Sequence, residues 1–355
     1  MTAAPQPRTD VREIEPYDSP QLDVVARLNT NECPHPLPAD FAEELAEAVR
    51  VLPLNRYPDG QMTRLREALA ARHGHTLEST WTANGSNEVL TELLLAYGGP
   101  GRRAVTFEPT YLLHSRLSHI TSTEVEPVEL GAPFLLDHAA IDRAVDSAPH
   151  VVFVCSPNNP TGNAQPLAAV SALAERLPEA LVVVDEAYIE FGGESALKLV
   201  ADRPNVAVVR TFSKAFAMAG ARLGYVLTSP DVVADLQRVR LPYHMSSLTQ
   251  AAGIVALRHS AEALSLLDSI RVQRDRIVRE LAAMPGVTVF PSDANFVLFL
   301  PPETHDAATV WRGLLDRGVL IRDLTSVVPR ALRVTAGAEH EVDLFLSTLQ
   351  EVLAA

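Results

Sequence analysis

Short runs of β-branched and apolar residues alternate with longer stretches of helical periodicity along this chain. The most strand-like runs lie at 103–107, 151–155, 181–185, 206–210 and 222–228. Such near-continuous apolar runs are typical of strands that helices cover on both faces, and a helix between two strands provides the crossover that parallel pairing requires. The alternation therefore predicts an α/β fold with a mostly parallel sheet.

The same periodicity divides the chain into parts. Helical patterns lie near 61–72, 87–97, 167–177, 231–239 and, as one long stretch, 246–282. Beyond that stretch the pattern changes to short strand-like runs at 287–290, 295–300, 319–322 and 332–335, with helices near 306–317 and 338–353. We therefore expect an N-terminal arm and helix (1–52) that pack with a small domain, a large domain (53–245), and a long connecting helix that leads into the small α+β domain (246–355).

Composition excludes several classes of protein. The 355 residues are 47% hydrophobic and 21% charged, and no apolar run approaches the ~20 residues of a membrane-spanning helix. The first fifteen residues carry proline and charge instead of an apolar core, so we expect no secretory signal and a cytoplasmic location. The net charge of −14 disfavours binding to nucleic acid or to anionic membranes. Cys33 and Cys155 have no disulfide-framework or metal-ligand spacing, so we expect reduced thiols and no metal.

The residues just beyond three of the predicted strands carry the chemistry. Ligands of open α/β sheets bind beyond the carboxyl ends of the strands. Asn159 lies in "SPNNPTG" (156–162) after one strand, Asp185 and Tyr188 follow the next, and Lys214 follows the third. Each has an ordinary structural explanation by itself, as a turn residue, a helix cap or a core tyrosine. Together, at the ends of neighbouring strands, they predict one ligand-binding rim.

Lys214 stands out because the chain has only two lysines, Lys198 and Lys214, among its 30 lysine and arginine residues. An arginine stays protonated in proteins, whereas a desolvated lysine can lose its proton and form a Schiff base with a carbonyl compound. Lys198 lies in "GGESALKLV" without comparable neighbours, and we expect it at the surface. Lys214 is therefore the candidate nucleophile.

Short motifs along the chain, taken in their sequence order, resemble those of fold-type I pyridoxal-phosphate aminotransferases, and most closely those of the histidinol-phosphate aminotransferases. The resemblance covers nearly the whole chain and rests on "VARLNTNE", "NRYPDG", "ANGSNE", "SPNNPTG", "VVVDEAYIEF", "RTFSKAFAMAGARLGY", "RLPYH", "SDANFVLF", "GVLIRD" and "LRVTAG". It implies an aspartate-aminotransferase-like fold, in which a large cofactor-binding domain holds a seven-stranded, mostly parallel sheet. It also implies pyridoxal 5′-phosphate as the cofactor.

The resemblance assigns cofactor-binding roles residue by residue. Lys214 would form the Schiff base with the cofactor and then move a proton between the substrate Cα and the cofactor C4′. Asp185 would keep the pyridine nitrogen protonated, Tyr188 and Asn159 would hydrogen-bond the ring O3′, and Tyr111 would stack on the ring. The phosphate would be bound by the start of a helix and by side chains beyond the strand at 206–210, namely Gly85, Ser86, Asn87, Thr211, Ser213 and Arg222.

The resemblance also implies a homodimer and a substrate class. Tyr57 would reach the cofactor phosphate in the neighbouring subunit. Arg333 matches the arginine that binds the substrate carboxylate in this family. In histidinol phosphate a phosphate takes the place of that carboxylate. Arg322, Tyr17 and Tyr243 would help to bind the phosphate and the imidazole ring. The implied activity, in histidine biosynthesis, exchanges amino and keto groups between L-histidinol phosphate or imidazole-acetol phosphate and 2-oxoglutarate or glutamate.

Departures from the family pattern lie near the substrate. "NECPHP" (31–36) replaces the usual Asn-Glu-Asn-Pro and aromatic residue, Ala217 replaces a common glycine or leucine, and "DLTSVVPRALRV" (323–334) lacks a glycine-rich turn. Two other activities stay open. One is an aromatic amino-acid aminotransferase acting on phenylalanine or tyrosine, since a pocket built for imidazole could hold a phenyl ring. The other is a pyridoxal-phosphate decarboxylase of a phosphorylated amino acid, which shares the implied scaffold. A cofactor-binding DNA regulator is disfavoured, because we find no helix-turn-helix segment or basic face.

Overall fold

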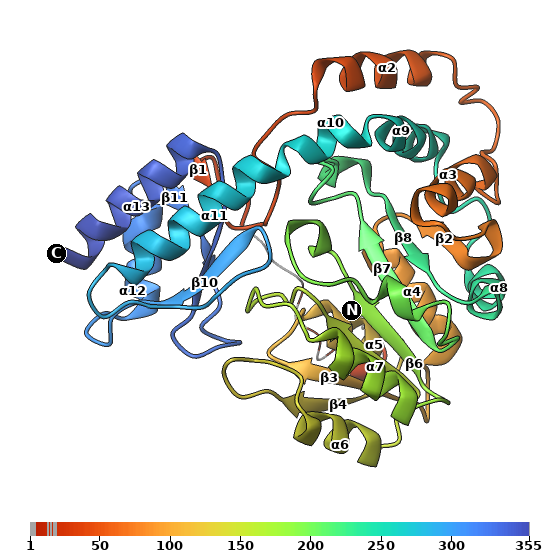
Figure 1. Ribbon diagram of the computed structural model, residues 1–355, viewed down its shortest axis with the longest axis horizontal. Helices are drawn as coiled ribbons and strands as arrows, with labels where there is room; N and C mark the ends of the chain where they lie inside the picture. Colours follow the sequence, from red (N-terminus) through yellow and green to blue (C-terminus); the bar gives the residue numbers. More distant parts are fainter. Residues whose placement is uncertain (1–4, 13, 15, 17–19, 355) are drawn as a thin grey trace.

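The largest element of the computed structural model, which describes residues 5–12, 14, 16 and 20–354, is a seven-stranded sheet (Figure 1). Its strand order is β2-β8-β7-β6-β5-β3-β4. Neighbouring strands are parallel, except that β8 runs antiparallel to both β2 and β7. The strands are β2 (Thr80–Ala83), β3 (Arg103–Glu108), β4 (Glu124–Glu129), β5 (Val151–Cys155), β6 (Leu181–Asp185), β7 (Val206–Thr211) and β8 (Gly224–Leu227). The predicted α/β fold with a mostly parallel sheet is confirmed.

Helices cover both faces of this sheet. Val152 and Val154 of β5 belong to one apolar cluster with α6 and α7, whereas Val151 and Phe153 belong to a second cluster with α4. Because successive residues of a strand point to opposite faces, a strand buried on both faces needs an unbroken apolar run, as the sequence has. The flanking helices are α3 (Thr63–His73), α4 (Ser86–Tyr97), α5 (Leu113–Ile120), α6 (His138–Asp146), α7 (Leu167–Arg176) and α8 (Pro230–Val239), with 3-10 turns η1 (Leu77–Ser79), η2 (Ile189–Phe191), η3 (Ala196–Leu199) and η4 (Ala219–Ala221).

A smaller antiparallel sheet, with strand order β12-β13-β10-β9, lies apart from the large one and is drawn in blue in Figure 1. Its core includes Phe299 of β10, whose ring meets that of Phe345 in α13 with centroids 6.1 Å apart. The elements are β9 (Thr288–Val289), β10 (Phe296–Leu300), α12 (Ala307–Leu315), β11 (Val319–Leu320), β12 (Arg322–Asp323), β13 (Leu332–Thr335) and α13 (Glu339–Ala354). This is the smaller α+β unit that the sequence pattern indicates.

The N-terminal segment contacts both parts of the chain. It contains α1 (Thr9–Arg12), β1 (Ala26–Arg27) and α2 (Ala39–Arg50). β1 pairs in parallel with β11 beside the small sheet, whereas α2 packs against α9 (Ser247–Arg258). The domain boundaries at 52 and 245 stay predictions.

The long helix expected over 246–282 is three consecutive helices instead, α9, α10 (Ser260–Ser265) and α11 (Leu267–Ala282). The first break falls at His259, whose ring stacks on Phe41 of α2 with centroids 5.5 Å apart and whose Nε2 lies 2.6 Å from Glu44 Oε2. These contacts with α2 are tertiary, and periodicity alone does not reveal them.

Two predicted strands are shorter than expected. The run 222–228 forms a strand only from Gly224, because Arg222 has a left-handed backbone with φ of 51°. The run 319–322 divides into β11, which pairs with β1, and β12, which pairs with β13. Among the described residues, no helix is both long and apolar enough to cross a membrane.

Candidate active site

A cavity of about 260 Å³ opens at the carboxyl ends of β5, β6 and β7. Its walls come from three parts of the chain: the N-terminal segment 29–31, the loops of the large sheet, and segments 322–327 and 333 of the small sheet. The predicted site residues that line it are Ser86, Asn87, Tyr111, Asn159, Asp185, Tyr188, Thr211, Ser213, Lys214, Arg222, Arg322 and Arg333. Residues far apart in sequence thus meet at one rim, while their individual roles stay predictions.

Lys214 lies just beyond β7 and is partly buried. Its Nζ donates a hydrogen bond to the backbone oxygen of Thr30, at 2.8 Å. Burial, assisted by the nearby charge of Arg333, lowers the pKa of Lys214 to about 8. Lys198, in contrast, is exposed and forms an ion pair with Glu194 at 2.6 Å. Only Lys214 of the two lysines thus has the surroundings of a nucleophilic amine.

Asp185 is the last residue of β6, and its side chain is buried. One carboxylate oxygen accepts a hydrogen bond from the backbone N–H of Ala187 at 3.1 Å, and the other lies 3.0 Å from Nε2 of His114. The His114 ring stacks on Phe153 with centroids 4.8 Å apart and meets the Tyr111 ring edge-on. Asp185 is thus held in one orientation by its own loop and by His114, which is itself packed on Phe153.

Tyr188, Asn159 and Arg333 line the same cavity as Lys214, and each has a defined partner. The Tyr188 hydroxyl accepts a hydrogen bond from Asn31 Nδ2 at 3.0 Å. The Arg333 guanidinium donates to Asn159 Oδ1 and, at 2.9 Å, to the backbone oxygen of Asn29. Arg333 therefore connects the small sheet to the loop after β5 and to the N-terminal segment.

Donors for an anion gather at the start of α4. No side chain caps the first amides of this helix in the described part of the chain, and Gly85 precedes it with φ of 84°. Ser213 Oγ accepts hydrogen bonds from Thr211 Oγ1 at 3.0 Å and from Arg222 Nη1 at 3.2 Å. A Cβ on Gly85 would lie 2.7 Å from Arg222 Nη2, so a larger residue there would displace the guanidinium. Helix amides, hydroxyls and a guanidinium together suit a phosphate group.

Two of the predicted tyrosines do not line this cavity. Tyr57 and Tyr243 are outside the set of residues that line it and stack on each other, with centroids 4.6 Å apart and 14° between the ring planes. Both are exposed, by 81% and 49%. Tyr17 lies outside the described residues. Of the four predicted tyrosines that the structure describes, Tyr111 and Tyr188 line the site in the isolated chain.

The outer wall of the cavity combines charge with apolar surface. Arg322 in β12 and Arg333 in β13 are paired across the small sheet, which places both guanidinium groups on this side. Leu112, Leu324 and Val327 contribute apolar side chains to the lining of the cavity. A ligand with both an anionic group and a flat ring would find matching surfaces here.

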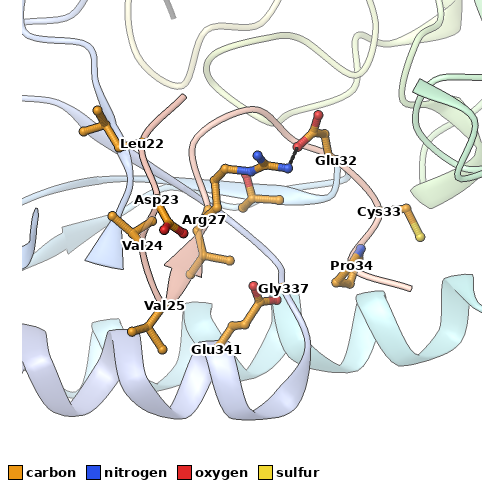
Figure 2. A pocket seen from close by; sticks show the side chains of 12 residues that line it. Leu22, Asp23, Val24, Val25, Arg27, Glu32, Cys33, Pro34, Gly337 and Glu341 are labelled. Carbon is orange, nitrogen blue, oxygen red and sulfur yellow. Dashed lines mark hydrogen bonds and ion pairs between the residues drawn. The ribbon is translucent and has the colours of Figure 1, made fainter. Parts of the chain in front are cut away.

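A second cavity, of about 320 Å³, lies between the N-terminal segment and the start of α13 (Figure 2). Its polar lining includes Asp23, Arg27, Glu32 and Glu341, and Arg27 pairs with Glu32 at 3.3 Å. Cys33 also lines it, and burial raises the pKa of the Cys33 thiol. This cavity does not include Lys214, and its lining offers no candidate for Schiff-base chemistry.

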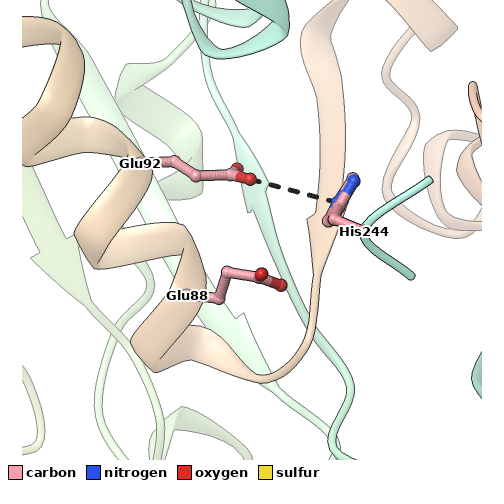
Figure 3. A group of neighbouring side chains, drawn as sticks. All are labelled: Glu88, Glu92 and His244. Carbon is pink, nitrogen blue, oxygen red and sulfur yellow. Dashed lines mark ion pairs between the residues drawn. The ribbon is translucent and has the colours of Figure 1, made fainter. Parts of the chain in front are cut away.

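Glu88, Glu92 and His244 form a cluster whose oxygen and nitrogen atoms lie within 4.8 Å of one another (Figure 3). Both carboxylates already have protein partners. Glu88 accepts a hydrogen bond from the Asn84 backbone N–H, and Glu92 accepts one from Trp81 Nε1 at 2.7 Å. Burial raises the pKa of Glu92 to about 8, which makes it a poor metal ligand at neutral pH. We interpret the cluster as a packing network that joins the His244 loop to the start of α4.

Comparison with known proteins agrees with this geometry. The family described as "Aminotransferase class I and II" matches residues 23–349. The chain belongs to this family. It is 47% identical to histidinol-phosphate aminotransferase of Paenarthrobacter aurescens, over 98% of this chain and 94% of that protein. It is also 49% identical to histidinol-phosphate aminotransferase of Thermobifida fusca, over 96% of this chain and 94% of that protein.

Solved structures of the family have the same fold as this aminotransferase. Histidinol-phosphate aminotransferase from Sinorhizobium meliloti, in complex with pyridoxal-5′-phosphate, superposes with a TM-score of 0.90 at 26% identity and covers 99% of this chain and 98% of that one. An aspartate aminotransferase mutant from Thermus thermophilus reaches a TM-score of 0.83 at 23% identity, over 98% and 99% of the two chains. The aspartate-aminotransferase-like fold is thus confirmed.

Sequence reasoning missed several residues of the site. His114 was not predicted, although it lies three residues after Tyr111, a spacing that places both on one side of a helical turn. Asn29, Thr30 and Asn31 lie in the motif "VARLNTNE", which predicts no role for them, because a segment before the sheet carries no sign of which loop it will contact. The 3.0 Å contact between His114 and Asp185 depends on parallel pairing of strands distant in sequence.

Proposed function

We propose that this aminotransferase uses pyridoxal 5′-phosphate to exchange amino and keto groups between L-histidinol phosphate and 2-oxoglutarate, the step of histidine biosynthesis that yields or consumes imidazole-acetol phosphate. The observation that carries the proposal is the placement of two arginines, Arg322 and Arg333, on the wall facing a half-buried Lys214. The names of the bacterial relatives, 47% and 49% identical over almost the full chain, support it.

The residues of the cavity fit the cofactor. The start of α4 with Ser213 and Arg222 offers donors for a phosphate, at one end of the cavity. Asp185 offers a buried carboxylate for a protonated ring nitrogen, and Tyr111 offers a ring for stacking. The Lys214 amine lies between these groups and the small sheet, and its lowered pKa suits attack on an aldehyde carbon. Bound pyridoxal phosphate supplies an electron sink for a carbanion at the substrate Cα.

The protein side chains would then orient the substrate and move its proton. Lys214 Nζ would take the proton from the substrate Cα and deliver a proton to the cofactor C4′. Asp185, held by His114, would keep a positive charge at the ring nitrogen. One site must hold the amino donor and the keto acceptor in turn, so we expect ping-pong kinetics.

Arg322 and Arg333 distinguish the candidate substrates. A guanidinium can bind a phosphate or a carboxylate with two parallel hydrogen bonds. Histidinol phosphate has no carboxylate, so both arginines would serve its phosphate, and the apolar wall at Leu112 and Leu324 would face the imidazole. The same wall would also take a phenyl ring, which keeps phenylalanine and tyrosine as the alternative substrates.

Steady-state turnover of L-histidinol phosphate, L-histidinol, phenylalanine and tyrosine, each with 2-oxoglutarate, tests the proposal. We expect kcat/KM for histidinol phosphate to exceed the others by about 100-fold, since two charged contacts at ~1.5 kcal/mol each would be lost without the phosphate. Arg322→Leu should remove most of that preference and leave phenylalanine turnover within a few-fold. Arg317→Leu, at an exposed position in the same part of the chain, is the matched control. Equal or better turnover of phenylalanine by the unaltered enzyme would assign it to the aromatic class, and CO₂ release would assign it to the decarboxylases.

We further infer that two copies of the chain form a dimer in which Tyr57 serves the neighbouring site. The exposed Tyr57 and Tyr243 rings stack on each other, and large apolar side chains are exposed in the same two segments, with Val51 and Leu54 each 65% exposed and Leu241 72%. When a partner covers apolar surface gathered in this way, its burial stabilises the complex. A second copy is the partner that the shared-site arrangement of the family implies.

A cytoplasmic location remains part of the proposal. Cys33 and Cys155 are both free thiols, as is usual for proteins of reducing compartments.

A further inference from the structure

Asn31 and Thr335 form a buried pair behind Tyr188. Asn31 lies in the N-terminal segment and Thr335 ends β13 of the small sheet, and they are only 2% and 3% exposed. The Asn31 backbone N–H donates to Thr335 Oγ1 at 3.0 Å, and Thr335 Oγ1 donates to the Asn31 side-chain oxygen, also at 3.0 Å. On its other side, Asn31 Nδ2 donates to the Tyr188 hydroxyl oxygen at 3.0 Å. A chain of hydrogen bonds thus runs from the small sheet to Tyr188.

The Thr335 hydroxyl decides which way the Asn31 amide faces. A hydroxyl carries one proton, and Thr335 Oγ1 already accepts from the Asn31 backbone. If the amide were reversed, its NH₂ group would also face Thr335 Oγ1, and the Thr335 proton would lose the acceptor that it has in the structure. Burying an unsatisfied hydroxyl costs about 1–3 kcal/mol. In the observed orientation the Asn31 backbone N–H, both ends of the Asn31 amide and the Thr335 proton are paired, and Nδ2 faces Tyr188.

The amide orientation in turn decides where the Tyr188 proton goes. Because the Tyr188 oxygen accepts from Asn31, its own proton must point to a different acceptor. Tyr188 lines the same cavity as Lys214, whose Nζ lies 5.9 Å from the centre of the Tyr188 ring. The other side of the ring is enclosed by Phe296, edge-on with centroids 5.1 Å apart, which offers no acceptor. The cavity is the direction left for the proton.

We propose that Asn31, held by Thr335, is a positioning residue that turns the Tyr188 hydroxyl proton into the cavity, so that Tyr188 donates to an anionic oxygen on the bound cofactor ring. This inference rests on the proposed function for the cofactor and extends it to two residues outside the predicted site. A donor aimed at the ring oxygen stabilises its negative charge. The bond from Asn31 polarises the Tyr188 hydroxyl and strengthens this donation.

The pH dependence of the holoenzyme's visible absorption band provides the measurement. A hydrogen bond to the anionic ring oxygen favours the high-pH form of the band, so its loss raises the midpoint of the spectral titration. Asn31→Asp offers the Tyr188 proton an acceptor outside the cavity while it preserves side-chain size. We expect the midpoint of this variant to rise by about one pH unit and its cofactor to dissociate about tenfold faster, as for the loss of one hydrogen bond to a charged group.

Thr335 supplies a variant pair without any change of charge. Thr335→Val removes the hydroxyl that orients Asn31 and keeps the shape, so its midpoint should rise as well, by about half a pH unit or more if the amide becomes free to reverse. Thr335→Ser keeps the hydroxyl and should restore the wild-type midpoint. This pair also tests the inference if Asn31→Asp fails to fold.

A Tyr188→Phe background separates positioning from a direct charge effect. If Asn31 acts through the Tyr188 proton, Asn31→Asp and Thr335→Val should leave the midpoint unchanged in that background. The inference is overturned if both variants titrate within about 0.2 pH unit of the unaltered enzyme, or if they shift the midpoint equally with and without the Tyr188 hydroxyl. These spectra do not depend on the amino donor, so an error in the proposed substrate would appear separately, as lack of turnover of histidinol phosphate.

Discussion

Gly224 packs so closely on Ser86 that a Cβ on Gly224 would lie 2.1 Å from the Ser86 backbone nitrogen. Gly224 is the first residue of β8 and Ser86 is the first residue of α4, so the contact presses the start of the helix, the proposed phosphate site, against the sheet. No L side chain fits in that space without displacement of the backbone on one side.

Gly224→Ala should therefore damage both stability and cofactor binding. We expect a loss of about 3 kcal/mol or more in the free energy of unfolding, since the neighbour is backbone and has no alternative rotamer. Gly220→Ala is the matched control, because a Cβ there would have nothing within 4 Å, and it should change stability by less than about 0.5 kcal/mol. Urea denaturation of the two variants checks this, and equal stability of both would contradict the close packing.

His114→Phe should weaken cofactor binding without loss of the stacking on Phe153. The substitution leaves a buried Asp185 carboxylate with one hydrogen-bond partner fewer, at a cost of about 1–3 kcal/mol, so we expect at least tenfold weaker retention of pyridoxal phosphate. Equilibrium dialysis of the cofactor measures it. His119→Phe, on the exposed side of the same helix, should bind cofactor as the unaltered protein does.

The reactivity of Lys214 in cofactor-free protein should follow its lowered pKa. Because the amine reacts only when unprotonated, labelling by an amine-specific reagent should reach half its maximum near the pKa of about 8 and fall as the pH decreases below it. An ordinary exposed lysine titrates near ~10.4. Peptide mass spectrometry can score Lys214 and Lys198 in one sample, since these are the two lysines of the chain. A half-maximum for Lys214 above about pH 10 would show that burial does not activate it.

Mixing two inactive variants tests whether Tyr57 serves the partner's site. A dimer of one Tyr57→Ala chain and one Lys214→Ala chain would have one site with both defects and one with neither. After subunit exchange, we expect recovery of about a quarter of wild-type activity, because half of the dimers are mixed and each has one intact site. If Tyr57 served its own subunit, every site would keep a defect and mixing would restore nothing.

The sequence predicted the large sheet well because the relevant signal is local. An unbroken apolar run such as 181–184 requires burial on both faces wherever it lies, and the next residue, Asp185, must emerge at the carboxyl edge of a parallel sheet. Lys214 likewise follows its strand closely enough for its place at that edge to be inferred. The break at His259 was not predictable in the same way, because it accompanies contacts with Phe41 and Glu44.

By itself, the sequence determined the class of fold, the candidate Schiff-base lysine and the order of strand-end residues around it, because burial and strand direction follow from short stretches of chain. Only the tertiary structure decided that Asn31 contacts Tyr188 across 157 positions and Thr335 across 304. It also decided that His114 holds Asp185 and that Tyr57 lies outside the cavity of its own chain. Such contacts depend on how separate elements pack, and a hydrogen bond between them carries no periodic signal in the sequence.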